Sequence, residues 1–286
     1  MSERRRANLW ALGAIALWAT LASLGVALSH VPPFLLTGLA LIAGSVLTWR
    51  QWRQWRVSPA ALALGVYGLF GFHFLLFVAL RSAPPVQANL VNYLWPLFIV
   101  VLAPLLLPGL RLRTVHVVAA ILGFCGAALA IVGGRTLSTA WAWGYAPAFG
   151  SALVWATFSL GSRRLAQTGQ GFPTAALGLF GLVSGLLALV CHAALEPASP
   201  LTARDLVLIA VMGLGPLGGA FLLWDRALKS GDPRTIGVLS YLTPLASTLL
   251  LVLLTGRALT PWTGLAALLI VAAALLAMRA DRAAAS

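Results

Sequence analysis

Charge is scarce in this sequence, and negative charge is almost missing. Only 9% of the 286 residues are charged, and 6 of these are Asp or Glu against 19 Lys and Arg. A soluble globular chain has roughly a quarter of its residues charged, so water is excluded as the solvent for most of this chain. With 60% hydrophobic residues and a mean hydropathy of +0.95, the composition predicts an integral membrane protein.

Cysteines, paired acids and metal motifs are also few or missing. Cys125 and Cys191 both lie inside apolar runs, which favours two small buried hydrophobic residues over a disulfide framework. No acid is expected in the middle of a membrane helix, which argues against a carboxylate proton relay or a sodium cage. The chain has no Walker motif, no His–Glu metal signature and no paired acids such as a metal-dependent membrane transferase needs. We expect no cofactor and no metal, and a membrane enzyme is the less favoured alternative.

Long apolar runs dominate the chain instead. Runs of about 20 residues are long enough to cross a bilayer, and short loops between them leave no room for a soluble domain. The predicted spans lie near 8–29, 33–49, 59–81, 86–107, 115–133, 142–162, 172–195, 205–226, 233–254 and 261–279. The sequence thus predicts an all-α membrane protein with ten transmembrane helices.

The basic residues predict its orientation, because Lys and Arg gather in cytoplasmic loops. With the N-terminus in the cytoplasm, 15 of the 19 basic residues lie inside. The four left outside are Arg81, Arg135, Arg204 and Arg257. Both termini are therefore expected in the cytoplasm. The net charge of +13 then reflects membrane topology, and nucleic-acid binding is not supported.

An internal repeat organises the chain. Arg81, Pro85, Tyr93 and Pro96 return as Lys229, Pro233, Tyr241 and Pro244, all at one offset of 148 residues (233 − 85, 241 − 93, 244 − 96). Trp18-Ala19-Thr20 returns as Trp155-Ala156-Thr157. Self-similarity of this kind fixes the architecture, here as two halves, 1–137 and 138–286. Five helices is an odd number, so the second half enters the membrane inverted, as in secondary transporters whose central cavity lies between the halves.

The N-terminus also imitates a secretory signal. Arg4-Arg5-Arg6 precedes an apolar run, and Ala27-Leu28-Ser29 looks like a cleavage site. Removal of this segment would leave five helices facing four. We therefore expect the first helix to be retained.

Glycine and proline predict close packing and helix breaks. Gly181 and Gly185, like Gly215 and Gly219, have the spacing that lets membrane helices approach closely. The sequence Gly213-x-Gly215-x-x-Gly218 matches a dinucleotide fingerprint only formally, because no strand precedes it. In the spans with Pro96 and Pro244, each proline frees the carbonyl four residues earlier, at Asn92 and Ser240. Such breaks either border a cavity or are harmless kinks.

Polar and aromatic side chains at mid-depth are the candidate binding residues. His73 is the titratable side chain expected well inside a helix, and membrane-embedded histidines are functional candidates. Asn89 and Tyr93 share a helix face. The alternative role for the asparagine is a hydrogen bond that holds two helices together. Trp18, Trp95 and Trp155 lie away from the helix ends, where a polar cavity would satisfy the indole N–H and core packing is the alternative. Asp225 and Arg226 are expected at a cytoplasmic helix end, paired or solvated.

Together these features resemble the drug/metabolite transporter superfamily. The resemblance rests on the two five-helix halves, the paired Trp-Ala-Thr sequences and the Pro-centred fourth and ninth helices. Within the superfamily, His73, the run Leu90-Val91-Asn92-Tyr93-Leu94-Trp95-Pro96-Leu97 and Trp155 resemble the bacterial aromatic amino acid exporter branch. The resemblance implies a central cavity lined by Phe72, His73, Leu76, Tyr93, Trp95 and Trp155. Repeat symmetry and helical spacing add Trp18, Asn89 and Tyr241.

The resemblance implies a multi-pass protein of the bacterial inner membrane that exports aromatic and other neutral amino acids by alternating access. Small multidrug exporters of the superfamily use a glutamate in the first helix, and residues 8–29 contain no acid. We therefore expect facilitative uniport. The alternatives are another cargo, such as a nucleoside, a small polar amino acid or a drug, and a scaffolding protein. The expected partners are a small-molecule substrate and the lipid bilayer, and the protein is expected to act as a monomer.

Overall fold

The computed structural model describes residues 3–133, 137, 140–255 and 260–282, with the side chains of 251, 254, 255, 281 and 282 left out. The described residues form helices and no strand. Arg135 and Arg257, which the topology prediction places on the outer side, lie outside the described ranges.

The first half of the chain contains helices that follow one another closely. They are α1 (Glu3–Trp18), α2 (Leu21–Ala27), α3 (Pro33–Ser45), η1 (Val46–Trp55), α4 (Pro59–Val66), η2 (Tyr67–Gly71), α5 (Phe72–Ser82), α6 (Pro85–Asn92), α7 (Trp95–Leu106) and α8 (Thr114–Val132). The second half contains α9 (Tyr145–Gln167), η3 (Thr174–Ala176), α10 (Leu177–Leu195), α11 (Ala203–Leu214), η4 (Gly215–Gly219), α12 (Ala220–Ser230), α13 (Pro233–Leu239), α14 (Leu242–Thr255) and α15 (Pro261–Arg282).

Within the described ranges, eight helical segments are long and apolar enough to cross a membrane. Each corresponds to one of the predicted spans, so the chain is a multi-pass membrane protein. The two remaining predicted spans correspond to α9 and to the pair α13 and α14. Helix α9 has 23 residues but carries several serines on its buried face, and a two-residue turn at Ser240 and Tyr241 divides the other span.

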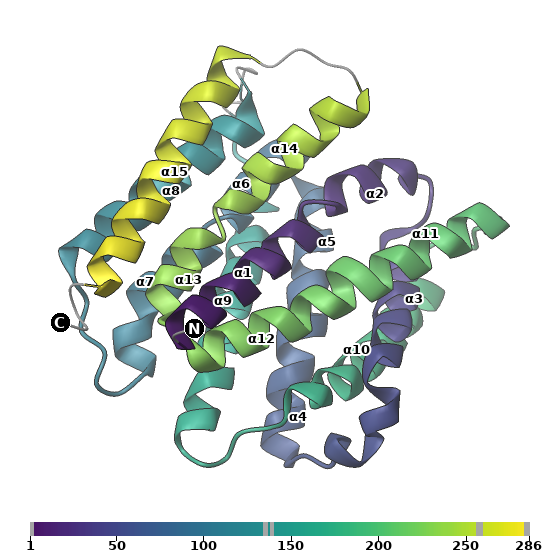
Figure 1. Cartoon of the computed structure of the whole chain (residues 1–286). Helices are drawn as coiled ribbons and strands as arrows, with labels where there is room; N and C mark the ends of the chain where they lie inside the picture. Colours follow the sequence, from purple (N-terminus) through teal and green to yellow (C-terminus); the bar gives the residue numbers. More distant parts are fainter. Residues whose placement is uncertain (1–2, 134–136, 138–139, 256–259, 283–286) are drawn as a thin grey trace.

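The helices pack in pairs that join the two halves of the chain. Helices α8 and α15 lie side by side, as do α3 and α10 (Figure 1). The first helix of each half packs against the third span of the other half, α1 against α12 and α9 against α5. The core is therefore built mostly between the halves.

Several spans are interrupted rather than straight. A π-turn divides two of them, at Tyr67–Gly71 and at Gly215–Gly219, and 215 − 67 gives the same offset of 148 that relates the two sequences. Each π-turn lets one carbonyl bond an N–H five residues later and shifts the following side chains around the helix axis. The sequence does not predict the π-turns, because their residues also fit a regular helix.

The proline breaks occur where the sequence predicts them. Helix α6 ends at Asn92 and α7 begins at Trp95, with Pro96 in its first turn. At the second break the Ser240 carbonyl accepts the Thr243 N–H at 3.0 Å, so the turn itself satisfies this acceptor. The two Trp-Ala-Thr copies differ, however. A break follows Trp18, whereas Trp155 lies in the uninterrupted helix α9.

Glycines set the closest helix contacts, as predicted. A Cβ on Gly44 of α3 would lie 2.7 Å from the Gly213 carbonyl oxygen and 3.0 Å from the Gly218 Cα. Gly65 and Gly68 accommodate the rings of Phe180 and Phe158. Gly215 faces more open space, since a Cβ there would lie 3.8 Å from its nearest neighbour, a side-chain carbon of Leu17. Two glycines of the formal dinucleotide fingerprint, Gly213 and Gly218, therefore serve helix packing.

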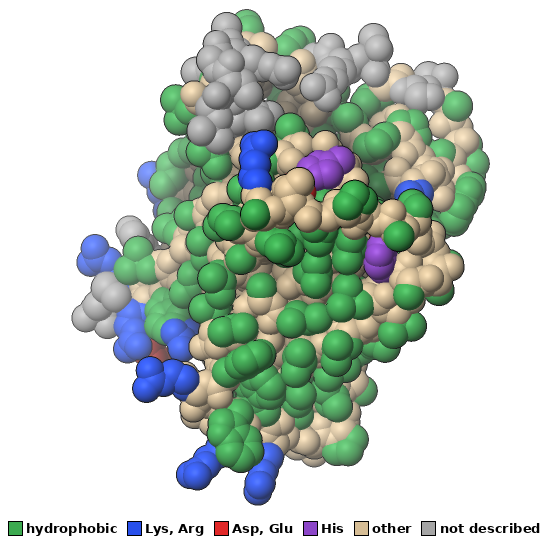
Figure 2. Space-filling view, turned by 90° about the vertical axis from the view of Figure 1, so that its right-hand side faces the viewer, with side chains coloured by type: hydrophobic (Ala, Val, Ile, Leu, Met, Phe, Trp, Pro, Cys, Tyr) green, Lys and Arg blue, Asp and Glu red, His purple; other side chains and the backbone are tan. Residues whose placement is uncertain are grey.

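The charged side chains gather at the two ends of the helical bundle. At the basic end, Arg164 donates to the Leu106 carbonyl at 3.0 Å and Arg113 donates to the Ala280 carbonyl at 3.1 Å. At the opposite end, Arg81 contacts the Glu196 carboxylate at 2.6 Å. Between the ends, one face is a broad band of hydrophobic side chains with Lys and Arg along its lower and left edges (Figure 2). This distribution fits a bilayer around the middle of the bundle.

We expect Gly44→Ala to destabilise the protein, because its new methyl group would collide with backbone atoms that cannot rotate away. Overpacking of this kind costs about 1–3 kcal/mol. The measurement is the midpoint of thermal unfolding in detergent. Gly25→Ala is the matched control, since Gly25 is also helical and has no neighbouring atom within 4 Å of the added Cβ. Equal midpoints for both variants would contradict the close contact between α3 and α11.

Candidate functional site

Aromatic side chains from several helices meet in the middle of the bundle. This aromatic cluster consists of Trp18 of α1, Phe72 of α5, Trp95 of α7, Trp155 and Phe158 of α9, and Phe221 and Trp224 of α12. The centroid of the Trp18 ring lies 5.9 Å from that of Trp155 and 5.2 Å from that of Trp224. Most of the rings meet edge to face or tilted, which are favourable geometries for aromatic pairs.

The π-turns supply this cluster with hydrogen-bond acceptors. The Trp18 indole N–H donates to the Pro216 carbonyl of the second π-turn at 3.1 Å. The His73 Nδ1 lies 2.6 Å from the Leu69 carbonyl of the first π-turn. A carbonyl only accepts, so this contact places the proton of a neutral His73 on Nδ1 and leaves Nε2 as an acceptor. His73 is buried beside Phe72, with ring centroids 5.0 Å apart.

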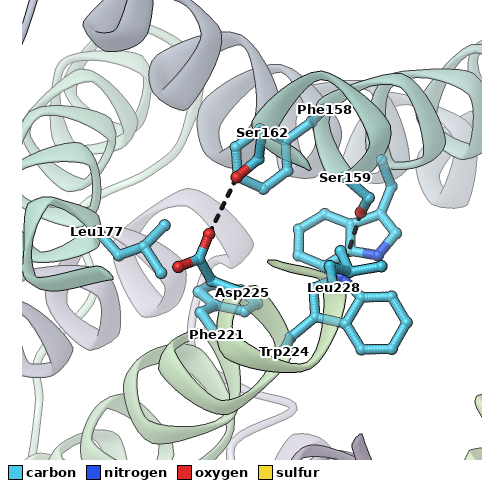
Figure 3. Close-up of a pocket in the computed structure, with 9 residues that line it drawn as sticks. Phe158, Ser159, Ser162, Leu177, Phe221, Trp224, Asp225 and Leu228 are labelled. Carbon is cyan, nitrogen blue, oxygen red and sulfur yellow. Dashed lines mark hydrogen bonds between the residues drawn. The ribbon is translucent and has the colours of Figure 1, made fainter. Parts of the chain in front are cut away.

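A small cavity adjoins the aromatic cluster (Figure 3). It is lined by Trp155, Phe158, Ser159, Ser162, Leu177, Phe221, Trp224, Asp225 and Leu228. The space open to the centre of a water-sized sphere is about 10 Å³, roughly that needed for one water molecule. A molecule larger than water does not fit this cavity in the present conformation.

Asp225 is the charged residue of the cavity wall. Its side chain is 5% exposed, and its Oδ1 accepts the Ser162 hydroxyl of α9 at 2.9 Å (Figure 3). Its Oδ2 accepts the Thr174 hydroxyl at 2.6 Å and the Lys229 ammonium at 2.7 Å. A buried carboxylate needs partners of this kind. The sequence placed Asp225 at a helix end, paired or solvated, and the structure shows it paired and buried.

A larger vestibule lies beyond Asp225 at the basic end. It has about 290 Å³ open to water and is lined by Glu3, Arg6, Trp10, Thr174, Arg226, Lys229 and Ser230. The guanidinium of Arg226 lies 4.6 Å from the Trp10 ring centroid. Asp225 separates the two spaces, because Ser162 lines the cavity whereas Thr174 and Lys229 line the vestibule.

Five of the nine predicted site residues come together here. Trp18, Phe72, Trp95 and Trp155 lie in the cluster, with His73 against it. Leu76 of α5, Asn89 of α6 and Tyr93 at the break after α6 are partly buried.

The ninth residue, Tyr241, lies elsewhere. It is fully buried with Ala127, Leu245 and Ile270, between α8, α14 and α15. The structure therefore does not bring Tyr241 together with the aromatic cluster. The buried amide of α6 is Asn92, whose Oδ1 accepts the Ser151 hydroxyl at 2.8 Å. This hydrogen bond joins two helices, which is the alternative to ligand binding that the sequence analysis gives for an asparagine of this helix.

The sequence interpretation missed the residues of α12. Phe221, Trp224 and Asp225 face the cavity, although they lie near the end of their span. A usable signal was the repeat, because an offset of 148 relates Phe221 to His73 and Trp224 to Leu76 (221 − 73, 224 − 76).

The groups around the cavity are of the kinds that recognise a ligand. The cavity offers aromatic walls, serine hydroxyls and one carboxylate. Among the described residues, no group of three or more His, Cys, Asp or Glu is placed to hold a metal ion. Such a site suits a ligand with an aromatic body and a small polar end.

Comparisons with known proteins agree with this description. The EamA-like transporter family matches residues 5–132 and 142–279. The chain is 38% identical over 260 residues to the "Aromatic amino acid exporter YddG" of Ancylobacter novellus, covering 87% of this chain and 89% of the relative. It is 25% identical over 199 residues to the "Uncharacterized transporter YyaM" of Bacillus subtilis, covering 66% of this chain and 63% of that protein. One solved crystal structure superposes with a TM-score of 0.90 at 37% identity, covering 99% of this chain and all of the other. The chain belongs to the EamA-like transporter family.

Proposed function

We propose that this protein exports aromatic and other neutral amino acids across the bacterial inner membrane. The observation that carries the proposal is the aromatic cluster, which gathers four tryptophans where helices of both halves meet, with His73 against it. Stacking against these rings would hold an aromatic side chain, and the polar groups beside them would replace its lost water. The relative named as an aromatic amino acid exporter supports the same cargo.

The architecture proposed for this function is two inverted repeats, residues 1–137 and 138–286. The two π-turns at one offset, the reciprocal packing of α1 on α12 and α9 on α5, and the two matched segments of the family support it. The ends of the bundle also correspond. Arg81 lies over the Phe34 ring and contacts Glu196, as Lys229 lies over the Phe172 ring and contacts Asp225.

Alternating access follows from this architecture. When two similar halves exchange conformations, a cavity open at one end becomes open at the other. The basic end would face the cytoplasm, because Lys and Arg are retained there. A cavity with room for about one water corresponds to an occluded state in such a cycle.

We expect Trp155→Ala to lower tryptophan flux in proteoliposomes about tenfold. The variant removes a ring that contacts Phe72, Trp95 and Phe221, and stacking of one ring contributes about 0.5–1.5 kcal/mol. Trp143→Ala is the matched control, because that ring is 61% exposed. Unchanged flux in Trp155→Ala and in His73→Ala would contradict a binding role for the aromatic cluster, and wild-type flux no higher than that of protein-free liposomes would favour a scaffolding role.

We expect tryptophan flux to continue without any imposed ion gradient. His73 is held by a backbone carbonyl, and Asp225 is held by two hydroxyls and an ammonium, so neither group is poised as a proton carrier. Labelled tryptophan should equilibrate across the liposome membrane down its own gradient. Flux that required a proton gradient would contradict uniport, and competition by a panel of nucleosides and small polar amino acids would reveal another cargo.

A further inference from the structure

The polar network around Asp225 lies at the boundary between the closed cavity and the open vestibule. One carboxylate oxygen faces Ser162 in the cavity wall, and the other binds Thr174 and Lys229 in the vestibule wall. Any solute that moves from the vestibule to the aromatic cluster by this route must therefore pass the carboxylate.

Lys229 acts as a resident cation for this carboxylate. Besides Asp225, its ammonium donates to the Phe172 carbonyl at 2.8 Å and lies 4.2 Å from the Phe172 ring centroid. These contacts tie α12 to the segment between α9 and α10 and close the cavity at the basic end. Separation of these elements would remove Thr174 from Asp225 and the Phe172 carbonyl from Lys229, while the ion pair itself stays on α12, where its members lie four residues apart. Charged groups that lose hydrogen-bond partners in a buried site are unfavourable, so opening favours a solute whose own charged groups replace these partners.

We propose that Asp225 binds the ammonium group of the cargo, which replaces Lys229, while Lys229 turns to the carboxylate of the same molecule. This inference rests on the proposed function, and it adds the residues that recognise the amino acid's charged end. An amino acid carries both charges of the ion pair that it displaces, so no charge is left unpaired during the exchange. Arg6 and Arg226 in the vestibule wall add positive charge that attracts the carboxylate.

The opposite end of the bundle also has a buried carboxylate paired with a cation, but this carboxylate does not lie beside the aromatic cluster. Glu196 also binds a cation, Arg81, but its oxygens accept the backbone N–H groups of Phe34 and Leu35 and contact His192 at 3.0 Å. Glu196 does not line the cavity next to the aromatic cluster. Recognition of the ammonium is thus placed at the basic end, where an exporter takes up its cargo.

The test uses two analogues of tryptophan that each keep one charge, tryptamine with the ammonium and indole-3-propionate with the carboxylate. Inside-out membrane vesicles present the basic end to the medium, and the readout is inhibition of labelled tryptophan uptake. Wild-type protein should bind tryptamine at least tenfold more tightly than indole-3-propionate. Asp225→Asn should weaken tryptamine at least tenfold and leave indole-3-propionate nearly unchanged.

Two further variants keep the test decisive. Lys229→Gln removes the resident cation, so tryptamine should raise its thermal unfolding midpoint in detergent more than it raises that of the wild type. Misfolding of the Asp225→Asn variant would explain a loss of tryptamine binding, but it would not explain a gain of stabilisation by tryptamine in Lys229→Gln. Asp205→Asn is the matched control, because Asp205 is equally buried, at 4% exposure, but caps α11 at the opposite end.

The outcomes separate the two proposals. If wild-type vesicles take up no tryptophan, the proposed function fails. If tryptophan is taken up but the preference for tryptamine is the same in wild type and Asp225→Asn, or Lys229→Gln gains no stabilisation from tryptamine, the role of Asp225 is overturned.

Discussion

Inside a bilayer, every polar group must find its partner within the protein, because no water is available in the hydrocarbon region. This constraint explains why the irregular turns of the bundle and its aromatic side chains occur together. A π-turn or a proline break changes the regular bonding of helix carbonyls, and the indole and imidazole N–H groups of the centre need acceptors. The Trp18 bond to Pro216 and the His73 bond to Leu69 satisfy both needs at once. The polar centre of the protein is thus held by the irregularities of its helices.

The same constraint separates what the sequence predicts from what it does not. Scarce charge and long apolar runs predict the membrane helices, because the cost of charge in lipid acts on every residue of a span. The repeat relates Trp18 to Trp155, and both are found in the central cluster. Glycine spacing predicts a close helix contact at Gly185 but not its partner, which is α3: a Cβ on Gly185 would lie 2.8 Å from the Gly38 carbonyl oxygen.

Other features depend on contacts that a single span does not reveal. The π-turns shift the register of α12 relative to a regular helix, and this places Asp225 against Ser162. A helical wheel drawn for the whole span does not include that shift. Tyr241 shows the converse. It is the repeat counterpart of Tyr93, yet it packs between α8, α14 and α15, because a sequence repeat does not determine which helices surround each copy.

The small size of the central cavity has a consequence for the membrane itself. Protons and small ions cross a channel along connected water molecules, and apolar constrictions stop them by excluding that water. A space with room for about one water, closed by tryptophan and phenylalanine rings, does not hold such a chain. In this conformation the protein therefore offers ions no continuous water-filled path through its centre.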